Sequence, residues 1–399
     1  MSEKNKAEPA ENIDNRLRSL RVSKGLSQGE LAGMAGITRQ AVYAIETNQY
    51  LPTTGVALRL SRVLDCRVED LFNLVTSGEV VEGDWVGTLP EKSERTRVKV
   101  ARVGGRLVVR PVSQLGEVLN FTVPADGLLL GPAASGCEKR SANRVRIELL
   151  RDRRLVEEEI VVAGCDPAIF LAGDYLRRRH ERASVVGWTM GSTAALEALK
   201  RGEVHVAGLH IVDAKSGESN LPYLRRHLKG DGFTVVTFAA WEEGLVVRRG
   251  NPKGLRNVSD LARKDIEMIN REAGAGARLL LDAKLAAIGI QTAKIKGYGR
   301  IASSHLQVAS LVASGQADVG LSVRSAARLL NLDFIPLQEE RYDLVMPSKF
   351  LTGHPGLAGL LDTIVSRSFR TEIEALGGYD TRDTGKIQDL WSKTVPGRS

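Results

Sequence analysis

The chain has 399 residues, of which 43% are hydrophobic and 26% are charged. This composition excludes disorder along the whole chain and indicates two or three domains, each able to bury a core. No apolar run approaches the roughly 18 residues of a membrane helix, and residues 1–15 lack the apolar stretch of a signal peptide. We therefore expect a soluble, cytoplasmic protein without a membrane partner.

The formal net charge is +8, which indicates an anionic partner. Residues 161–399 carry a net charge of +6, whereas residues 1–75 and 76–160 each carry +1. The charge therefore favours a small anionic ligand in the C-terminal part as much as it favours DNA. The three cysteines are widely spaced and fit neither a disulfide framework nor a zinc pair.

Residues 1–15 are predicted to be disordered, and residues 16–75 to form a domain of short helices. Ser27 and Glu30 have the spacing of a capping box at a helix start, and Thr38 is placed to cap the following helix. A glycine separates the two helices. Two short helices joined in this way are typical of a helix-turn-helix.

The segments that carry this pattern are Leu26–Ala32, Gly36–Val42 and Ile45–Glu46. They resemble the phage-repressor-like (XRE-type) helix-turn-helix family. The resemblance implies a homodimer that binds double-stranded operator DNA, with the second helix of the motif in the major groove. The DNA-contacting residues that it implies are Gln28, Thr38, Arg39, Gln40, Tyr43 and Asn48. A small helical domain used for protein contact is the alternative.

Residues 76–155 are predicted to form a small β-rich element. Residues 98–103 and 106–110 have the pattern of a hairpin on a two-glycine turn, and residues 119–123 and 144–149 resemble further strands. The sequence leaves two alternatives open for this element. It is either a separate barrel-like insert or the first strands of the C-terminal domain.

Residues 156–399 alternate between strand and helix patterns, which predicts a mainly parallel α/β sheet with its ligand at the carboxyl ends of the strands. The predicted strands are residues 160–164, 184–188, 204–208, 233–238, 244–248, 266–269 and 317–321, and the predicted helices are residues 167–180, 194–201 and 279–287.

Two helix starts in this domain have the chemistry of an anion site. Ser192 and Thr193 offer hydroxyl and N–H groups at one start, and two glycines between Arg271 and Arg278 precede the other. Arginine adds bidentate donors for an oxyanion. Two such starts facing each other across a cleft would hold a tetrahedral oxyanion without a metal ion.

This half resembles the type II periplasmic-binding-protein fold in its cytoplasmic, regulator-fused version, which is similar to molybdate- and tungstate-binding proteins. Among the segments that carry the resemblance are Cys165–Ala168, Gly191–Thr193, Ala207–His210, Asn270–Glu272 and Ala317–Leu321. The ligand contacts that it implies are Ser192, Thr193, Arg271, Gly274, Gly276, Arg278, Tyr298 and His305.

Three residues of this half have an ordinary structural interpretation. His210 and His305 are equally well explained as loop or core histidines, and Cys165 is interpreted as a buried small residue rather than a nucleophile. A molybdenum cofactor would need an aromatic surface such as Trp188 or Tyr298.

Together these features predict a ligand-responsive, DNA-binding transcriptional regulator whose C-terminal domain senses molybdate or tungstate. A sensor of molybdenum cofactor or of an organic anion is the alternative. An enzyme is disfavoured because the sequence has no nucleophile elbow, P-loop, metal pair or spaced catalytic carboxylates. A binding or storage protein is a third interpretation. The sequence does not show which operator sequence is recognised or whether the regulator represses or activates transcription.

Overall fold

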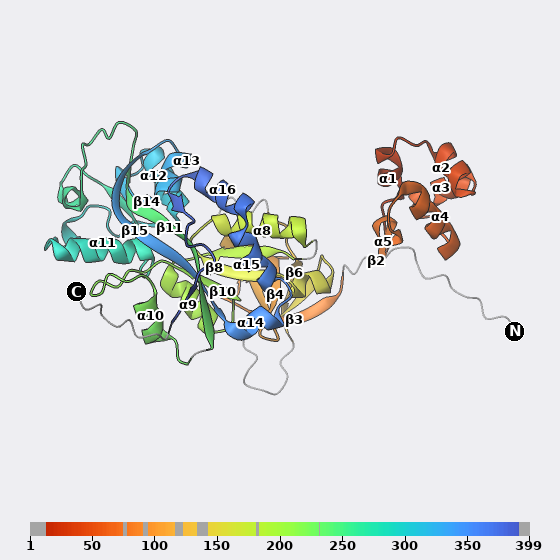
Figure 1. Ribbon diagram of the computed structural model, residues 1–399. Coiled ribbons are helices and arrows are strands. Elements are labelled where there is room, and N and C mark those ends of the chain that lie inside the picture. Colours follow the sequence, from red (N-terminus) through yellow and green to blue (C-terminus); the bar gives the residue numbers. More distant parts are fainter. Residues whose placement is uncertain are drawn as a thin grey trace.

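The computed structural model describes residues 13–74, 78–90, 95–115, 123–133, 143–180, 183–230 and 232–390. These residues form a helical N-terminal head, a closed five-stranded barrel and a large α/β domain (Figure 1), which confirms the predicted multidomain fold class. In this part of the chain no helix is both long and apolar enough to cross a bilayer.

The head is a compact set of short helices. They are α1 (Leu17–Ser23), α2 (Gln28–Ala35), α3 (Arg39–Glu46), α4 (Thr54–Leu64) and α5 (Val68–Leu71). The predicted capping box is confirmed, since the Ser27 hydroxyl accepts from the N–H of Glu30 and the Glu30 carboxylate accepts from the N–H of Ser27. The Thr38 hydroxyl accepts from the N–H of Ala41 and starts α3 as predicted. Gly36 ends α2 in the left-handed conformation, with φ +64°.

Residues 13–15 contradict the prediction of a disordered N-terminus. They form strand β1 (Ile13–Asn15), which pairs antiparallel with β2 (Phe72–Leu74) and ties the two ends of the head together. Strands of three residues are too short to show the alternation by which strands are recognised in a sequence. The rest of the predicted tail, residues 1–12, lies outside the described residues.

The middle element is a closed barrel, which decides between the two alternatives left open by the sequence. Its strands are β3 (Val80–Trp85), β4 (Arg97–Val103), β5 (Arg106–Pro111), β6 (Gly127–Pro132) and β7 (Arg144–Leu149), in the order β3-β5-β4-β6-β7. The predicted β4–β5 hairpin is confirmed, with Gly104 and Gly105 at φ +57° and +85°. The predicted strand 119–123 lies almost wholly outside the described residues.

Helix α7 (Arg153–Glu157) leads from the barrel into the α/β domain, which has two lobes. Lobe 1 contains the parallel strands β8 (Ile160–Gly164), β9 (Val185–Thr189) and β10 (Val206–Leu209), with helices α8 (Ala168–Arg179), α9 (Ser192–Lys200) and α10 (Leu221–His227). Lobe 2 contains the parallel strands β12 (Met268–Arg271), β13 (Ile301–Ala302) and β14 (Val319–Val323), with helices α11 (Gly276–Ala287), α12 (His305–Ala313) and α13 (Arg324–Leu329).

Two long antiparallel strands, β11 (Phe233–Val247) and β15 (Asp333–Pro347), pass from one lobe to the other (Figure 1). Near one end, β15 pairs with β10, and near the other end β11 pairs with β14. The remaining elements are α14 (Ser348–Gly353), α15 (Leu357–Val365), α16 (Arg367–Leu376), β16 (Tyr379–Asp380) and β17 (Ile387–Gln388).

Strand β11 corrects two sequence predictions. Residues 233–238 and 244–248 were expected to be separate strands, but they belong to one strand with register shifts near Thr237 and Glu243. The sheet is also mixed rather than mainly parallel, because parallel pairing is confined to each lobe. The polar residues at the middle of β11 interrupt its apolar pattern. They do so because Glu243 faces a buried polar site instead of a hydrophobic core.

Candidate functional site

The carboxyl ends of β8, β10 and β12 meet the start of α12 at the middle of β11 and β15. Polar side chains gather at this junction, and none of them is more than 4% exposed. They are Cys165 and Asp166 after β8, His210 after β10, Arg271 at the end of β12, His305 at the start of α12, Glu243 in β11 and Glu340 in β15. We call this group the interlobe cluster. Its position agrees with the expectation that a ligand binds at the carboxyl ends of the strands.

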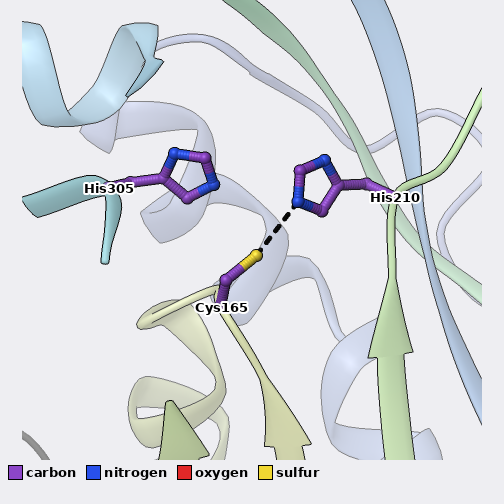
Figure 2. A group of neighbouring side chains, drawn as sticks. All are labelled: Cys165, His210 and His305. Carbon is purple, nitrogen blue, oxygen red and sulfur yellow. Dashed lines mark hydrogen bonds between the residues drawn. The ribbon is translucent and has the colours of Figure 1, made fainter. Parts of the chain in front are cut away.

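His210 is the centre of the interlobe cluster. Its Nε2 atom lies 3.1 Å from the Sγ atom of Cys165 (Figure 2), and its Nδ1 atom lies 2.7 Å from Oε2 of Glu340. The second carboxylate, that of Glu243, comes within 3.6 Å of the same Nδ1 atom. The N–H of His210 donates to the Ser192 hydroxyl at 3.1 Å. One imidazole therefore connects a thiol on one side with two carboxylates on the other.

Several buried atoms of the cluster have no hydrogen-bond partner among the described residues. They are both ring nitrogens of His305, both carboxylate oxygens of Glu243, Nη1 of Arg271 and Oδ2 of Asp166. A buried polar group without a partner costs about 1–3 kcal/mol, and proteins contain few of them. Their concentration at one buried junction makes the interlobe cluster the candidate ligand site.

The two carboxylates of the cluster have opposite pKa shifts. Burial raises the pKa of Glu340 above its usual range, and the neighbouring Glu243 carboxylate raises it further. Burial would also raise the pKa of Glu243, but the neighbouring His210 imidazole outweighs burial and lowers it. At neutral pH the pair therefore holds one ionised carboxylate and one that retains its proton.

The two imidazoles also differ. Burial opposes a charge on His210, yet the Cys165 sulfur and the Glu243 carboxylate raise the pKa of His210 well above its usual range. Burial and the nearby Arg271 guanidinium together lower the pKa of His305 well below its usual range. His305 is consequently a neutral imidazole with a free lone pair, which is the form that accepts a hydrogen bond or coordinates a metal ion.

The two helix starts predicted to face each other are in direct contact. The N–H of Thr193 donates to the carbonyl of Gly274 at 3.2 Å. A side chain at Gly274 would collide with the Thr193 hydroxyl, and one at Gly276 would collide with the carbonyl and ring of His210. The glycines therefore allow lobe 2 to approach lobe 1 closely. The loop itself offers backbone groups but no hydroxyl, since Ala275 and Ala277 flank Gly276.

The predicted ligand residues divide into two groups. Arg271 and His305 are members of the interlobe cluster, and Ser192 contacts His210 within it. Arg278 and Tyr298 form a separate network in lobe 2. The Nε atom of Arg278 donates to the Tyr298 hydroxyl at 3.1 Å, its Nη1 atom donates to the carbonyl of Arg271, and its guanidinium lies 3.9 Å from the centre of the Tyr298 ring. Several donors of Arg278 are thus already used within the chain.

Sequence reasoning missed Glu243 and Glu340. Each lies in the middle of a 15-residue strand whose other half belongs to a different lobe. The signal available in the sequence was a carboxylate, Glu243, directly before the apolar run Gly244–Val247. The prediction of two short strands, residues 233–238 and 244–248, left Glu243 between them as a connecting residue. The carboxylates approach His210 only through long-range pairing, which spacing along the chain does not reveal.

The head presents part of α3 to solvent. Val42 and Ile45 are buried, whereas Arg39, Gln40 and Tyr43 are exposed. This is the division expected of a helix that packs on one side and reads base edges on the other.

The other predicted DNA-contacting residues have partners inside the head. Thr38 caps α3, and the Gln28 amide donates to the Glu46 carboxylate at 2.8 Å. The Asn48 side chain accepts from Asn15 at 2.9 Å, and its backbone has φ +58°. The exposed part of α3 is therefore the surface with the most direct access to a base.

Comparisons with known proteins agree with the division of the chain into a helical head and an α/β domain. Residues 17–71 match the helix-turn-helix family model, and residues 173–364 match the PBP superfamily domain. The uncharacterized protein YvgK of Bacillus subtilis (strain 168) is 35% identical over 228 residues, which are 57% of this chain and 73% of YvgK.

A second relative covers the head. The uncharacterized HTH-type transcriptional regulator YgzD of the same organism is 38% identical over 60 residues, 15% of this chain and 91% of YgzD. Among solved structures, a putative phosphate ABC transporter substrate-binding protein from Clostridium perfringens has 14% identity and a TM-score of 0.42. It covers 56% of this chain and 99% of its own. That similarity is too low to bear on the ligand.

Proposed function

The chain belongs to the helix-turn-helix family in residues 17–71 and to the PBP superfamily in residues 173–364, and on this premise we propose a ligand-responsive transcriptional regulator. The observation that carries the proposal is the combination, in one chain, of an exposed α3 surface and an interlobe cluster rich in unpartnered polar groups. The first reads DNA and the second senses a small ligand. The regulator acts in the cytoplasm as a homodimer on paired half-sites.

Ligand binding acts on the relative position of the lobes. Cys165 and His210 belong to lobe 1, whereas Arg271 and His305 belong to lobe 2. A ligand that contacts residues of both lobes binds best when the lobes are together, and it therefore shifts the population toward that arrangement. Coupling between two sites in one protein is typically worth about 1–3 kcal/mol.

We propose molybdate or tungstate as the ligand, on the family resemblance of the sequence and on the chemistry of Arg271. Its guanidinium is 1% exposed, and Nη1 has no hydrogen-bond partner among the described residues. A buried arginine with a spare donor suits an oxyanion. A molybdenum-cofactor species and an organic anion are the alternative ligands.

Calorimetric titration of the full chain tests the anion. Molybdate and tungstate are expected to bind more tightly than sulfate or phosphate. Arg271→Ala should abolish molybdate binding, while Arg278→Ala, whose Nε and Nη1 already donate within lobe 2, should weaken it less. If the wild type and Arg271→Ala bind molybdate with equal affinity, Arg271 is not part of the anion site.

A gel-shift titration tests the regulatory half of the proposal. The duplex used is selected from a random pool by the purified protein, because the operator is unknown. Saturation with the sensed anion should change the operator affinity about 5- to 150-fold. If the operator affinity is unchanged when the protein is saturated with the anion, the chain binds the anion but is not a ligand-responsive regulator.

A further inference from the structure

We infer that Cys165, His210 and His305 bind a zinc ion or a transition-metal ion of similar chemistry, with a fourth coordination position left open. The side chains converge from three elements, since Cys165 follows β8, His210 follows β10 and His305 begins α12 (Figure 2). The metal site itself is independent of the proposed function. Only its regulatory meaning rests on that function.

The geometry suits a small ion. The three ligand atoms, one thiol sulfur and two ring nitrogens, all lie within 4.8 Å of one another. In a tetrahedral zinc site, a sulfur and a nitrogen ligand are about 3.5 Å apart, given Zn–S and Zn–N bonds of about 2.3 and 2.0–2.1 Å. The observed 3.1 Å between Sγ of Cys165 and Nε2 of His210 differs from this by a few tenths of an ångström. Small side-chain rotations are enough to admit the ion.

The unpartnered imidazole of His305 favours a metal ion over a simple hydrogen bond. A thiol–imidazole hydrogen bond would account for the contact between Cys165 and His210. It leaves His305 unexplained, because both of its ring nitrogens are buried and have no partner among the described residues. The ring of His305 is 5.6 Å from the ring of His210, centre to centre. A shared ion would satisfy a ring nitrogen of His305 that the chain leaves without a partner.

The donor types select the class of ion. One thiolate and two imidazoles are ligands for zinc, copper, cobalt and nickel, whereas magnesium and calcium prefer oxygen. His210, Glu243 and Glu340 form a second possible group around the same imidazole. There the 2.7 Å contact between Nδ1 of His210 and Glu340 is a hydrogen bond. We therefore place the ion on the Nε2 side, next to the sulfur.

Glu340 is the positioning residue of this site. A carboxylate that accepts a hydrogen bond from Nδ1 of a histidine fixes the ring and leaves Nε2 free for the metal ion. Glu243 lies 3.8 Å from Nδ1 of His305, beside the other imidazole but beyond hydrogen-bond distance. The carboxylates of Glu243 and Glu340 are both fully buried beside the proposed ion, within reach of its histidine ligands.

The metal ion would connect the lobes. Two of its ligands come from lobe 1 and the third from lobe 2, so a loaded site favours the lobes being together. The open fourth position could accept an oxygen of an anion, as in zinc sites with three protein ligands.

Cobalt titration of the full chain, after treatment with a chelator and with thiols kept reduced, tests the inference. We expect one Co²⁺ per chain, a near-ultraviolet thiolate-to-cobalt band and the visible bands of a four-coordinate ion, all removed by one equivalent of Zn²⁺. Cys165→Ser should lose the thiolate band, and Glu340→Gln should lower the zinc affinity about 10- to 100-fold. Cys66→Ser, which changes a partly exposed thiol of the head, is the matched control and should behave as the wild type.

The outcomes separate the two proposals. No stoichiometric cobalt binding by the wild type, or a thiolate band that survives in Cys165→Ser, would overturn the metal site while leaving an anion-responsive regulator intact. Stoichiometric cobalt binding without any effect on operator affinity would support the metal site and contradict a regulatory role of the metal ion, while the anion response is tested by the gel-shift titration with molybdate. His305→Gln provides a second variant if Cys165→Ser does not fold, and it should also lose stoichiometric cobalt binding.

Discussion

Arg39 is the first residue of α3, exposed at the end of the helix that lies nearest the base edges in the helix-turn-helix family. Arginine at such a place recognises guanine through two hydrogen bonds, and Gln40 beside it suits adenine. Among the described residues, neither side chain has a hydrogen bond that would hold it away from DNA. Gln28 differs, because its amide donates a hydrogen bond to Glu46. We therefore expect base recognition to depend mainly on the exposed residues of α3.

Substituting Arg39→Ala is expected to lower operator affinity by about 1–3 kcal/mol, because it removes a bidentate base contact. Affinity for a duplex of unrelated sequence should fall much less. Arg62→Ala, which changes an exposed arginine of α4, is the control, and any loss that it causes should be similar on both duplexes. Fluorescence anisotropy with the two duplexes measures this. A loss of equal size on both duplexes in Arg39→Ala would mean that Arg39 contacts phosphate rather than a base.

The interlobe cluster illustrates how far single residues could be predicted from the sequence. Arg271 and His305 were identified because each occurs beside a helix start or strand end, in a motif that is recognisable locally. Glu243 and Glu340 were not, because their roles arise from strand pairing between residues about 100 positions apart. Cys165 was interpreted as a small core residue, since only the fold places His210 next to its sulfur.

At the scale of elements, local signals gave the right structure where local contacts dominate. The capping box of α2, the cap of α3 and the two-glycine hairpin of the barrel each involve residues close in sequence, and all three are confirmed. The strand β1 and the undivided strand β11 depend on distant partners, and both were missed. The starts of α9 and α11 were expected to face each other across a cleft, and their direct contact is also a contact between distant parts of the chain.

Gly276→Ala tests that contact. An added methyl group would collide with the carbonyl of His210, so the start of α11 and lobe 1 must move apart. We expect weaker binding of zinc or molybdate, together with a loss of stability of about 1–3 kcal/mol, the usual cost of overpacking. Gly299→Ala, where a methyl group has open space, should leave both unchanged. Urea unfolding and calorimetry measure the two effects, and wild-type ligand affinity in Gly276→Ala would show that the close approach is not required for binding.

At the scale of the whole molecule, the barrel is joined to lobe 1. Barrel residues such as Val103, Val108 and Val112 share a core with Val161 and Val186 of lobe 1. Buried ion pairs reinforce the junction, with Lys99 Nζ 2.9 Å from the Glu159 carboxylate and Arg110 2.8 Å from Glu203. The barrel and lobe 1 thus share one core, and we propose that the signal is a movement of lobe 2 relative to them.

His205 gives this junction a pH dependence. Its Nδ1 atom accepts from the N–H of Val161 in lobe 1, and its Nε2–H donates to the carbonyl of Arg102 in the barrel. Burial, with a contribution from His354, lowers the pKa of His205 from 6.5 to about 4. The unfolded chain therefore binds a proton more readily than the folded chain between these values. The stabilisation is complete above pH 6.5 and is lost as the pH falls towards 4, with a total on the order of 3 kcal/mol.

Urea unfolding between pH 7 and 4 checks this prediction. His205→Asn, which removes the titrating ring, should flatten the decline in the free energy of unfolding. His227→Gln, which changes an exposed histidine, should leave the decline as in the wild type. An equal slope in wild type and His205→Asn would mean that other groups cause the acid sensitivity.

The net charge of +8 is consistent with two anionic partners at opposite ends of one chain. Since the head carries only +1 of this charge, we expect DNA recognition to depend on the particular residues of α3 more than on the overall electric field of the protein. The α/β domain holds most of the excess positive charge, but its interlobe cluster contains the buried carboxylates of Glu243 and Glu340 as well as Arg271, so the local charge there is mixed.

Coupling between the interlobe cluster and the DNA-binding head can be measured as a change in operator affinity by fluorescence anisotropy. The full chain is treated with a chelator and then saturated with zinc, with molybdate, or with both, at constant ionic strength. We predict a change in operator affinity of about 5- to 150-fold in at least one saturated state, and a much smaller change in the double variant Cys165→Ser, Arg271→Ala. An operator affinity that is identical in all states, although calorimetry shows the site to be occupied, would contradict the account.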